Sequence, residues 1–203
     1  MFIVLTSEQE ITNEAKLLNQ LFNAGLEVLH LRKPSFKEEA YRSLLQQIEA
    51  QFYNRIMLHE YHHLCEEFNL KGIHIQEQPR LDLGNDLKKY VNRFKINNFI
   101  VSSSFHEPEV LASCQVDFDY HLLSPVFSSI SKKGYEGRGF DVSHIDKKIV
   151  GMGGINTQTT ADTFELGYTG IGVLGGVWNT IDPMESFQHI KQHYDTYSQG
   201  EIK

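Results

Sequence analysis

Eight short apolar runs recur along the chain, and they limit the fold more than any other feature of the sequence. Each run is at most six residues long and is rich in Val, Ile and Leu. Near-continuous apolarity over so short a length is typical of strands that are buried on both faces. The runs are FIVLT (2–6), EVLHL (27–31), RIMLH (55–59), KGIHI (71–75), NFIVSS (98–103), DYHLL (119–123), KIVGM (148–152) and GIGVLG (170–175).

The segments between these runs have the periodicity of amphipathic helices. In EAKLLNQLFNAG the apolar residues fall on one helical stripe, which consists of Ala15, Leu17, Leu18, Leu21 and Phe22. Asn156 or Thr157 fits a helix start, and Asp182, directly before a proline, fits another. Gly167 stands where a helix should end.

Alternating strand and helix units imply a parallel sheet. Eight such units predict a closed (β/α)8 TIM barrel, and an open, doubly wound α/β sheet is the alternative. The 203 residues fit one domain covering 1–203, and no linker or low-complexity tract divides them. In such a barrel the active site lies at the C-terminal ends of the strands, so the residues that follow each run are the candidates for function.

Composition limits the partners and the location. The net charge of −7 argues against a nucleic-acid partner, which usually meets a basic surface. No apolar run approaches the roughly 18 residues that span a membrane, and the start of the chain lacks the basic region of a signal peptide. Cys65 and Cys114 are expected to be buried free thiols, as in a reducing compartment. These features predict a cytoplasmic protein that acts on a small molecule, and they leave a homodimer open.

Four histidines and an arginine gather at the ends of the runs. The residues are His30, Arg32, His59, His74 and His106. Turns favour Ser and Gly, which accounts for neighbours such as Ser104 but not for this grouping of imidazoles and a guanidinium. Interior packing is an equally good explanation for His30 and His74, and capping of the next helix is an alternative role for His106.

Two glycine pairs follow the seventh and eighth runs. Gly153 and Gly154 belong to GMGGIN, and Gly175 and Gly176 belong to VLGGVW. Glycine lets backbone N–H groups approach a ligand, and the loops after strands seven and eight form the usual phosphate site of this fold. Tight turns also use glycine pairs, but their position at these two strand ends favours phosphate binding.

The sixth run continues into a long polar loop, SSISKKGYEGRG (128–139). Long loops inside compact domains are often binding loops or lids. Ser129, Ser131 and Lys132 are predicted to donate to an anionic ligand, and the glycines of the loop would let it close over that ligand. A solvated loop without such a role is the alternative.

Several of these stretches resemble the thiamine-phosphate synthase/TenI family. HLRK resembles the family's Q/H-L-R-x-K, SFHEPEV resembles S-V-H-S-x-E-E, and VGMGGIN resembles A-I-G-G-I. The most specific match is DYHLLSPVFSSISKKG, which resembles D-Y-V-x-x-G-P-I-F-x-T-x-T-K-x-G. The resemblance covers most of the chain and implies the same barrel.

The resemblance implies a thiazole phosphate as substrate. The synthase (thiamine-phosphate pyrophosphorylase) joins a pyrimidine diphosphate to it and releases pyrophosphate with Mg²⁺, whereas TenI-type members aromatise a thiazole carboxylate phosphate by moving a proton. Arg32 then matches the diphosphate site and His106 matches the acid/base of TenI-type members. Ser129, Ser131 and Lys132 match T-x-T-K, and the two glycine pairs match the thiazole-phosphate site.

The chain departs from the family pattern on the diphosphate side. Pro34 replaces the second basic residue, and His59-Glu60 replaces the Asn-Asp whose aspartate binds magnesium. Pro79 replaces the second metal-binding aspartate. Glu60 could still supply one carboxylate, with Glu77 or Asp82 as a second. A charge that complements a helix N-terminus is an equally good explanation for Glu60.

These observations favour a TenI-type thiazole tautomerase, which needs no cofactor. GYEGRGFD also resembles the P-G-R-G-L of that type. The predicted catalytic residues are His106, Ser104 and Glu60, and His30 and His59 join the predicted substrate-binding residues. The alternatives are the synthase, with Mg²⁺ on Glu60, a non-catalytic barrel that binds a thiamine precursor, and another phosphate-binding barrel.

Overall fold

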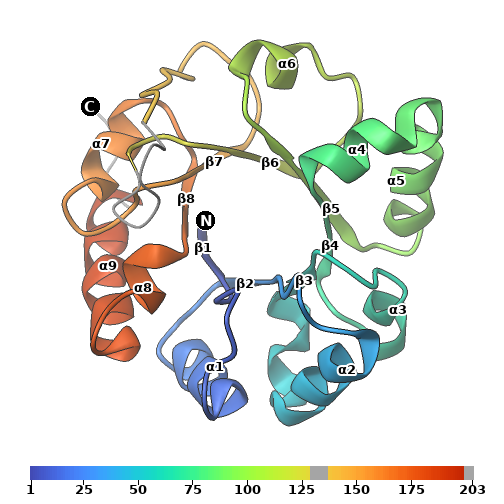
Figure 1. Ribbon diagram of the computed structural model, residues 1–203. Coiled ribbons are helices and arrows are strands. Elements are labelled where there is room, and N and C mark those ends of the chain that lie inside the picture. The colour runs from blue at the N-terminus through green and yellow to red at the C-terminus, as the bar shows by residue number, and fades with distance from the viewer. Residues whose placement is uncertain (129–136, 199–203) are drawn as a thin grey trace. The chain divides into compact units, whose positions relative to one another are not determined.

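The computed structural model describes residues 1–128 and 137–198. Its parallel strands close into a barrel in the order β1 to β8 (Figure 1). This confirms the predicted TIM-barrel fold over the open sheet. The strands are β1 (Phe2–Leu5), β2 (Val28–Leu31), β3 (Ile56–Leu58), β4 (Gly72–Ile75), β5 (Ile100–Phe105), β6 (Tyr120–Leu123), β7 (Ile149–Met152) and β8 (Gly170–Val173).

Helices lie between successive strands of the barrel except between β6 and β7, where the described residues contain none (Figure 1). No helix in residues 1–128 and 137–198 is long and apolar enough to cross a membrane. The helices are α1 (Glu14–Asn23), α2 (Glu38–Gln47), η1 (Ala50–Arg55), α3 (Leu64–Phe68), α4 (Glu77–Leu83), η2 (Gly84–Asp86), α5 (Leu87–Lys95), α6 (Pro108–Ser113), α7 (Thr160–Glu165), α8 (Gly175–Trp178) and α9 (Pro183–Ser198).

The chain divides into two compact units, and the first contains residues 1–4, 105–114 and 120–203. Within it β6, β7, β8 and β1 pair in parallel, as in Leu122 with Val150 and Ile3 with Gly172. The ring of Phe2 stacks on Phe187 of α9 with 5.3 Å between centroids. The first unit therefore has an apolar contact between its strands and its last helix.

The second unit contains residues 5–104 and 115–119. Strands β2 to β5 pair in parallel, with His30 beside Met57 and His74 beside Ser102. The rings of Phe22 and Phe52 stack with 4.8 Å between centroids. This register fixes which strand-end side chains of the unit lie next to one another.

Two helix boundaries that the sequence predicts, at Gly167 and Asp182, agree with the structure, whereas the predicted start of α7 does not. Gly167 adopts a positive φ of 88° after α7 and so permits the predicted helix end. Asp182 accepts hydrogen bonds from two backbone N–H groups at the start of α9, as predicted. However, α7 begins at Thr160 because Asn156 and Thr159 form a preceding turn, in which the Asn156 N–H donates to Thr159 Oγ1 at 3.0 Å.

Both cysteines are free thiols, as the sequence predicts. Cys65 is buried on α3, whereas Cys114 is only half-buried at the end of α6. Burial raises the pKa of the Cys65 thiol to about 12. The thiol form is the unreactive one, so Cys65 acts as a small apolar side chain in the core.

Candidate active site

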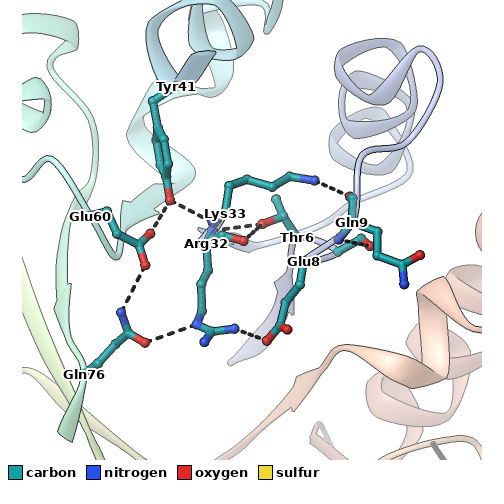
Figure 2. A network of polar contacts seen from close by, with 9 residues as sticks. Thr6, Glu8, Gln9, Arg32, Lys33, Tyr41, Glu60 and Gln76 are labelled. Atoms are coloured by element: carbon teal, nitrogen blue, oxygen red, sulfur yellow. Dashed lines mark hydrogen bonds and ion pairs between the residues drawn. The ribbon is translucent and has the colours of Figure 1, made fainter. Parts of the chain in front are cut away.

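Arg32 follows β2 in the second unit, and its backbone is fixed by Thr6. The Thr6 hydroxyl donates to the Arg32 carbonyl at 2.8 Å and accepts the Arg32 N–H at 2.9 Å. The guanidinium donates through Nε to Gln76 Oε1 at 3.1 Å and pairs with the exposed Glu8 through Nη1 (Figure 2). The predicted anion-binding arginine is therefore oriented by neighbouring side chains.

Glu60 follows β3 and belongs to the same network of contacts. Its carboxylate accepts a hydrogen bond from the Tyr41 hydroxyl and another from Gln76 Nε2 at 3.1 Å (Figure 2). The Tyr41 oxygen in turn accepts the Lys33 N–H at 2.8 Å. Burial, and then the carboxylate of Glu60, raise the pKa of Tyr41 above its usual value. Tyr41 therefore stays a neutral donor that holds Glu60 in place.

Gln76 links Arg32 and Glu60, because its amide accepts from the first and donates to the second. We name Glu8, Arg32, Tyr41, Glu60 and Gln76 the arginine–glutamate network. Sequence reasoning missed Tyr41, Gln76 and Glu8. Gln76 directly follows β4, so the strand-end rule could have found it, whereas nothing in the sequence indicates that Tyr41 of α2 reaches Glu60.

Lys33 is adjacent to Arg32 but points to other residues. Its buried ammonium pairs with Glu14 at 2.7 Å and donates to the Gln9 carbonyl at 2.8 Å. Burial raises the pKa of the Glu14 carboxyl although Lys33 opposes this shift. Lys33 thus connects the segment after β1 to α1, and Arg32 is the cation of the arginine–glutamate network.

His30, His59 and His74 lie together in the second unit. His30 Nδ1 and His59 Nε2 are 2.9 Å apart, and His74 contacts the hydroxyls of Ser102 at 2.8 Å and Ser104 at 2.6 Å. Burial lowers the pKa of His30 to about 3 and lowers those of His59 and His74 well below the usual value. The three rings are therefore neutral, and Ser104 is a hydrogen-bond partner of one of them.

The residues near the second aspartate position of the family have partners of their own. Pro79 lies in α4, where Glu77 pairs with Arg80 at 3.3 Å. Asp82 accepts from Gln78 at 2.8 Å. Among the carboxylates that the sequence suggested for a metal, only Glu60 belongs to the arginine–glutamate network.

His106 lies in the first unit, between β5 and α6. Its carbonyl accepts from Arg138 Nη1 at 3.2 Å, and the Arg138 guanidinium also grips the Glu107 carboxylate at 2.6 and 3.0 Å. Arg138 lies over the ring of Phe140 at 4.5 Å. The guanidinium lowers the pKa of the Glu107 carboxyl. Arg138 therefore ties the start of α6 to the segment that follows residue 136.

The first glycine pair turns sharply after β7. Gly153 and Gly154 have φ of 93° and 67°, which L side chains rarely adopt. A Cβ at Gly154 would lie 2.7 Å from the Ser128 carbonyl oxygen, and one at Gly153 would lie 2.9 Å from Pro125 Cα. The segment after β6 thus packs directly on this turn.

The second glycine pair opens α8. Gly175 and Gly176 are its first two residues, and a Cβ on Gly176 would lie 2.5 Å from the carbonyl oxygen of Ile155. The first turn of a helix has backbone N–H groups that no intrahelical carbonyl accepts. The two glycine pairs therefore stand in adjoining turns of the first unit, and they could hold a phosphate with backbone donors.

Three predicted residues, Ser129, Ser131 and Lys132, lie outside the described residues, so their predicted role stays a prediction. The described ends of that loop are joined by hydrogen bonds. The Gly137 N–H donates to Ser128 Oγ at 2.8 Å, and the Gly139 N–H donates to the Val126 carbonyl at 2.9 Å.

A closed parallel barrel with cationic and carboxylate side chains after its strands, and glycine turns after β7 and β8, defines a (β/α)8-barrel protein. A sequence model of the TMP-TENI family, described as thiamine monophosphate synthase, matches residues 1–177. The chain belongs to this family, which places it among the enzymes of thiamine biosynthesis, as the sequence predicted.

Individual relatives carry the synthase name. The chain is 23% identical to the thiamine-phosphate synthase of Actinobacillus succinogenes, over 90% of this chain and 88% of that protein. It is 28% identical to the thiamine phosphate pyrophosphorylase of Bacteroides thetaiotaomicron, with a TM-score of 0.74 over 96% and 97% of the two chains. The Pyrococcus furiosus pyrophosphorylase shares the fold at 17% identity, with a TM-score of 0.75 over 98% and 96%.

Proposed function

We propose that this chain is a thiamine-phosphate synthase, which joins a pyrimidine diphosphate to a thiazole phosphate and releases pyrophosphate. The sequence by itself favours the TenI-type tautomerase, but the names of the relatives support the synthase better. The observation that carries the proposal is the arginine–glutamate network, because it sets a guanidinium beside a carboxylate at strand ends. A proton shuttle between two atoms of one thiazole would not need this pair.

Arg32 binds the diphosphate in this proposal. A guanidinium matches the geometry of phosphate oxygens and keeps its charge at every relevant pH. Gln76 and Glu8 hold the guanidinium from two sides, so little side-chain freedom is lost when the ligand arrives. On binding, the diphosphate replaces the exposed Glu8 as the anionic partner of Arg32.

The residues present fit a magnesium ion that is shared with the substrate. Both donors to Glu60, the Tyr41 hydroxyl and the Gln76 amide, are neutral, so the carboxylate charge has no cationic partner among these contacts. Mg²⁺ is usually bound by one or two carboxylates together with substrate phosphates. Glu60 would hold the ion, with Glu8 as a second carboxylate once Arg32 turns to the diphosphate. When bound, the ion would offset the charge of the departing pyrophosphate.

The thiazole phosphate is assigned to the two glycine turns of the first unit. Gly153 and Gly154 permit backbone donors where a side chain would collide with residues 125–128. Gly175 and Gly176 add the first turn of α8. Backbone donors suit a phosphate that does not react, because they bind it equally in the ground and transition states.

The tautomerase remains a second candidate because of His106. Imidazole is the side chain that most often serves as a general acid and base, which suits proton transfer at a thiazole ring. Arg138 holds the His106 carbonyl, and the GRG segment that contains Arg138 resembles TenI-type members. In this alternative the chain needs no metal, and Glu60 has only a structural role.

One assay with two substrate sets tests the proposal. The full-length protein is incubated with the pyrimidine diphosphate, thiazole phosphate and Mg²⁺, and thiamine phosphate and pyrophosphate are quantified by chromatography. A parallel reaction contains the thiazole carboxylate tautomer phosphate and EDTA. We expect thiamine phosphate only when Mg²⁺ is present. Aromatisation in EDTA without any thiamine phosphate in the first reaction would replace the synthase by the tautomerase.

The Arg32→Gln variant tests the network in the same assay. Loss of one group that stabilises the charge of a departing anion typically lowers kcat by about 10²–10³, so we expect thiamine phosphate formation to fall by this factor. Arg42→Gln is the matched control, because Arg42 is a surface arginine of α2 that pairs with Glu38 and Glu67. Equal activity of the two variants would contradict the role of Arg32.

A further inference from the structure

Three buried imidazoles meet on consecutive strands of the second unit. His30 belongs to β2, His59 directly follows β3, and His74 belongs to β4. One ring nitrogen of each lies within 4.8 Å of the others. His30 and His74 are fully buried and His59 is 6% exposed. The chain thus gathers three strong metal-ligand groups out of water, at a place that the proposed reaction does not use.

The arrangement of the rings agrees with coordination of a single ion. Ring centroids are 5.0 Å apart for His30 and His59, 5.1 Å for His30 and His74, and 4.3 Å for His59 and His74. Nitrogens around a tetrahedral zinc ion lie about 3.4 Å apart, given Zn–N bonds of about 2.0–2.1 Å. The His30–His59 nitrogen pair at 2.9 Å needs only a small opening to reach this separation.

The chemical state of the rings also suits a metal. All three rings are buried side by side, and an imidazole with one N–H has a lone pair on its other nitrogen that can bind a metal. His59 Nδ1 is buried and has no hydrogen-bond partner within residues 1–128 and 137–198. This nitrogen can carry the ring proton, which leaves the lone pair on Nε2, the nitrogen that faces His30.

Hydroxyl groups next to His74 supply the supporting contacts that metal-bound histidines usually have. Ser102 Oγ lies 2.8 Å from His74 Nδ1 and can accept its proton, which would leave the other nitrogen free to bind once Ser104 moves. Ser102 is itself fully buried. This contact fixes the orientation of the ring before any ion binds.

We propose that His30, His59 and His74 form a binding site for a divalent transition-metal ion, with Zn²⁺ as the best match. Imidazole nitrogen suits Zn²⁺, whereas Mg²⁺ requires oxygen ligands, so this site is distinct from the magnesium site on Glu60. Three protein ligands leave a fourth position for water or a substrate group, as in catalytic zinc sites. The inference stands whether or not the synthase proposal does.

Cobalt titration of the metal-free protein tests the site. The experiment uses the full chain with His189→Ala and His193→Ala, because these two exposed histidines lie four residues apart on α9 and could bind the metal themselves. The protein is then dialysed against EDTA. Co²⁺ is then added at pH 7.5 and the visible absorption of tetrahedral cobalt is followed. We expect saturation at one equivalent, with the absorption lost when Zn²⁺ displaces the cobalt. Absence of the tetrahedral absorption would overturn the proposal.

Ligand variants test which residues bind. His59→Asn should weaken the cobalt affinity at least 100-fold, since even loss of a supporting contact typically costs about 10–100-fold. His63→Asn is the matched control, because His63 is an exposed histidine that contacts Glu38 at 3.1 Å. Unchanged affinity in His59→Asn would contradict the assignment.

X-ray absorption of the zinc-loaded protein in which His30, His59 and His74 are all present gives a measurement that does not depend on how the His59→Asn variant folds. Three imidazole ligands per zinc are expected. Fewer than three would show that the rings form only a hydrogen-bonded cluster inside the barrel, and the proposal would then be wrong.

Discussion

The second unit builds its candidate site from side chains, whereas the first unit builds its site from backbone and glycine. In the arginine–glutamate network, each group is oriented by another side chain, such as Gln76 between Arg32 and Glu60. At Gly153 and Gly154, by contrast, the turn itself is the proposed functional element, and any Cβ would collide with the segment after β6.

This difference explains where the chain departs from its family. A site made of side chains can keep a carboxylate although some of its residues change. Pro79 stands at the second aspartate position of the family, but Glu60 still supplies a carboxylate, which Tyr41 and Gln76 hold. A site made of backbone tolerates most neighbouring changes but no side chain at its turns. Substitutions should therefore have graded effects in the network and all-or-none effects at the glycine turns.

The largest expected effect concerns the buried ion pair beside the network. Lys33→Met leaves the Glu14 carboxylate buried without its partner at 2.7 Å. Removing one member of a buried pair typically costs about 3–5 kcal/mol of unfolding free energy. Urea unfolding followed by circular dichroism measures this loss. The double variant Lys33→Met/Glu14→Leu removes both charges and should recover most of it; no recovery would mean that Lys33 acts through Gln9 instead.

The next effect should be lost binding at the glycine turn. Gly154→Asp places a Cβ 2.7 Å from a carbonyl oxygen at a φ of 67° and adds a negative charge where a phosphate is proposed to bind. Calorimetry with thiazole phosphate should show an affinity at least about 100-fold weaker, because a negative charge placed against the phosphate typically costs several kcal/mol.

Gly84→Ala is the control for the strain itself. Gly84 also has a positive φ, of 47°, but a Cβ there meets nothing within 4 Å. This variant should lose some stability and keep its affinity for thiazole phosphate. If Gly154→Asp binds the ligand as well as Gly84→Ala does, the phosphate does not lie at this turn.

The same contrast explains what the sequence could predict. The barrel follows from apolar runs and periodic helices, which depend on local patterns that need no tertiary contact to be recognised. Arg32, Glu60 and the glycine pairs were chosen as candidates because active sites of this fold lie at the C-terminal ends of the strands. Tyr41 was missed because its role comes from α2 reaching another element, and the start of α7 was misplaced because a side-chain turn at Asn156 delays the helix.

Some interpretations also failed on burial. Cys114 was expected to be buried and is half-exposed instead, because it ends the short helix α6. Conversely, nothing in the spacing of His30, His59 and His74 indicates that their rings would meet. Their contact depends on the register of β2, β3 and β4, which single strands do not reveal.

A graded effect is expected at Gln76. Gln76→Ala removes the amide that links Arg32 and Glu60 but leaves both charges in place. A lost hydrogen bond to a charged group is worth about 1.5–3 kcal/mol, so synthase kcat/KM should fall by about tenfold to a hundredfold. Gln78→Ala, on the exposed side of α4, is the control. Full activity of Gln76→Ala would show that Arg32 is oriented by Glu8 alone.

The smallest effect on synthase activity is expected from His106→Asn. If the chain is a synthase, no proton has to be moved by His106, and thiamine phosphate formation should stay within about tenfold of the unsubstituted protein. If it is a tautomerase, loss of its acid/base group should lower aromatisation by about 10²–10⁴. The Arg138–Glu107 contact and the His106 carbonyl involve no part of the imidazole, so the backbone before α6 should keep its position.

Rate assays on both substrate sets, with Glu107→Gln as the control for that ion pair, therefore separate the two reactions. A loss of synthase activity of about 10³ in His106→Asn alone would contradict the division of roles, because a side chain of the first unit would then take part in the chemistry attributed to the network of the second.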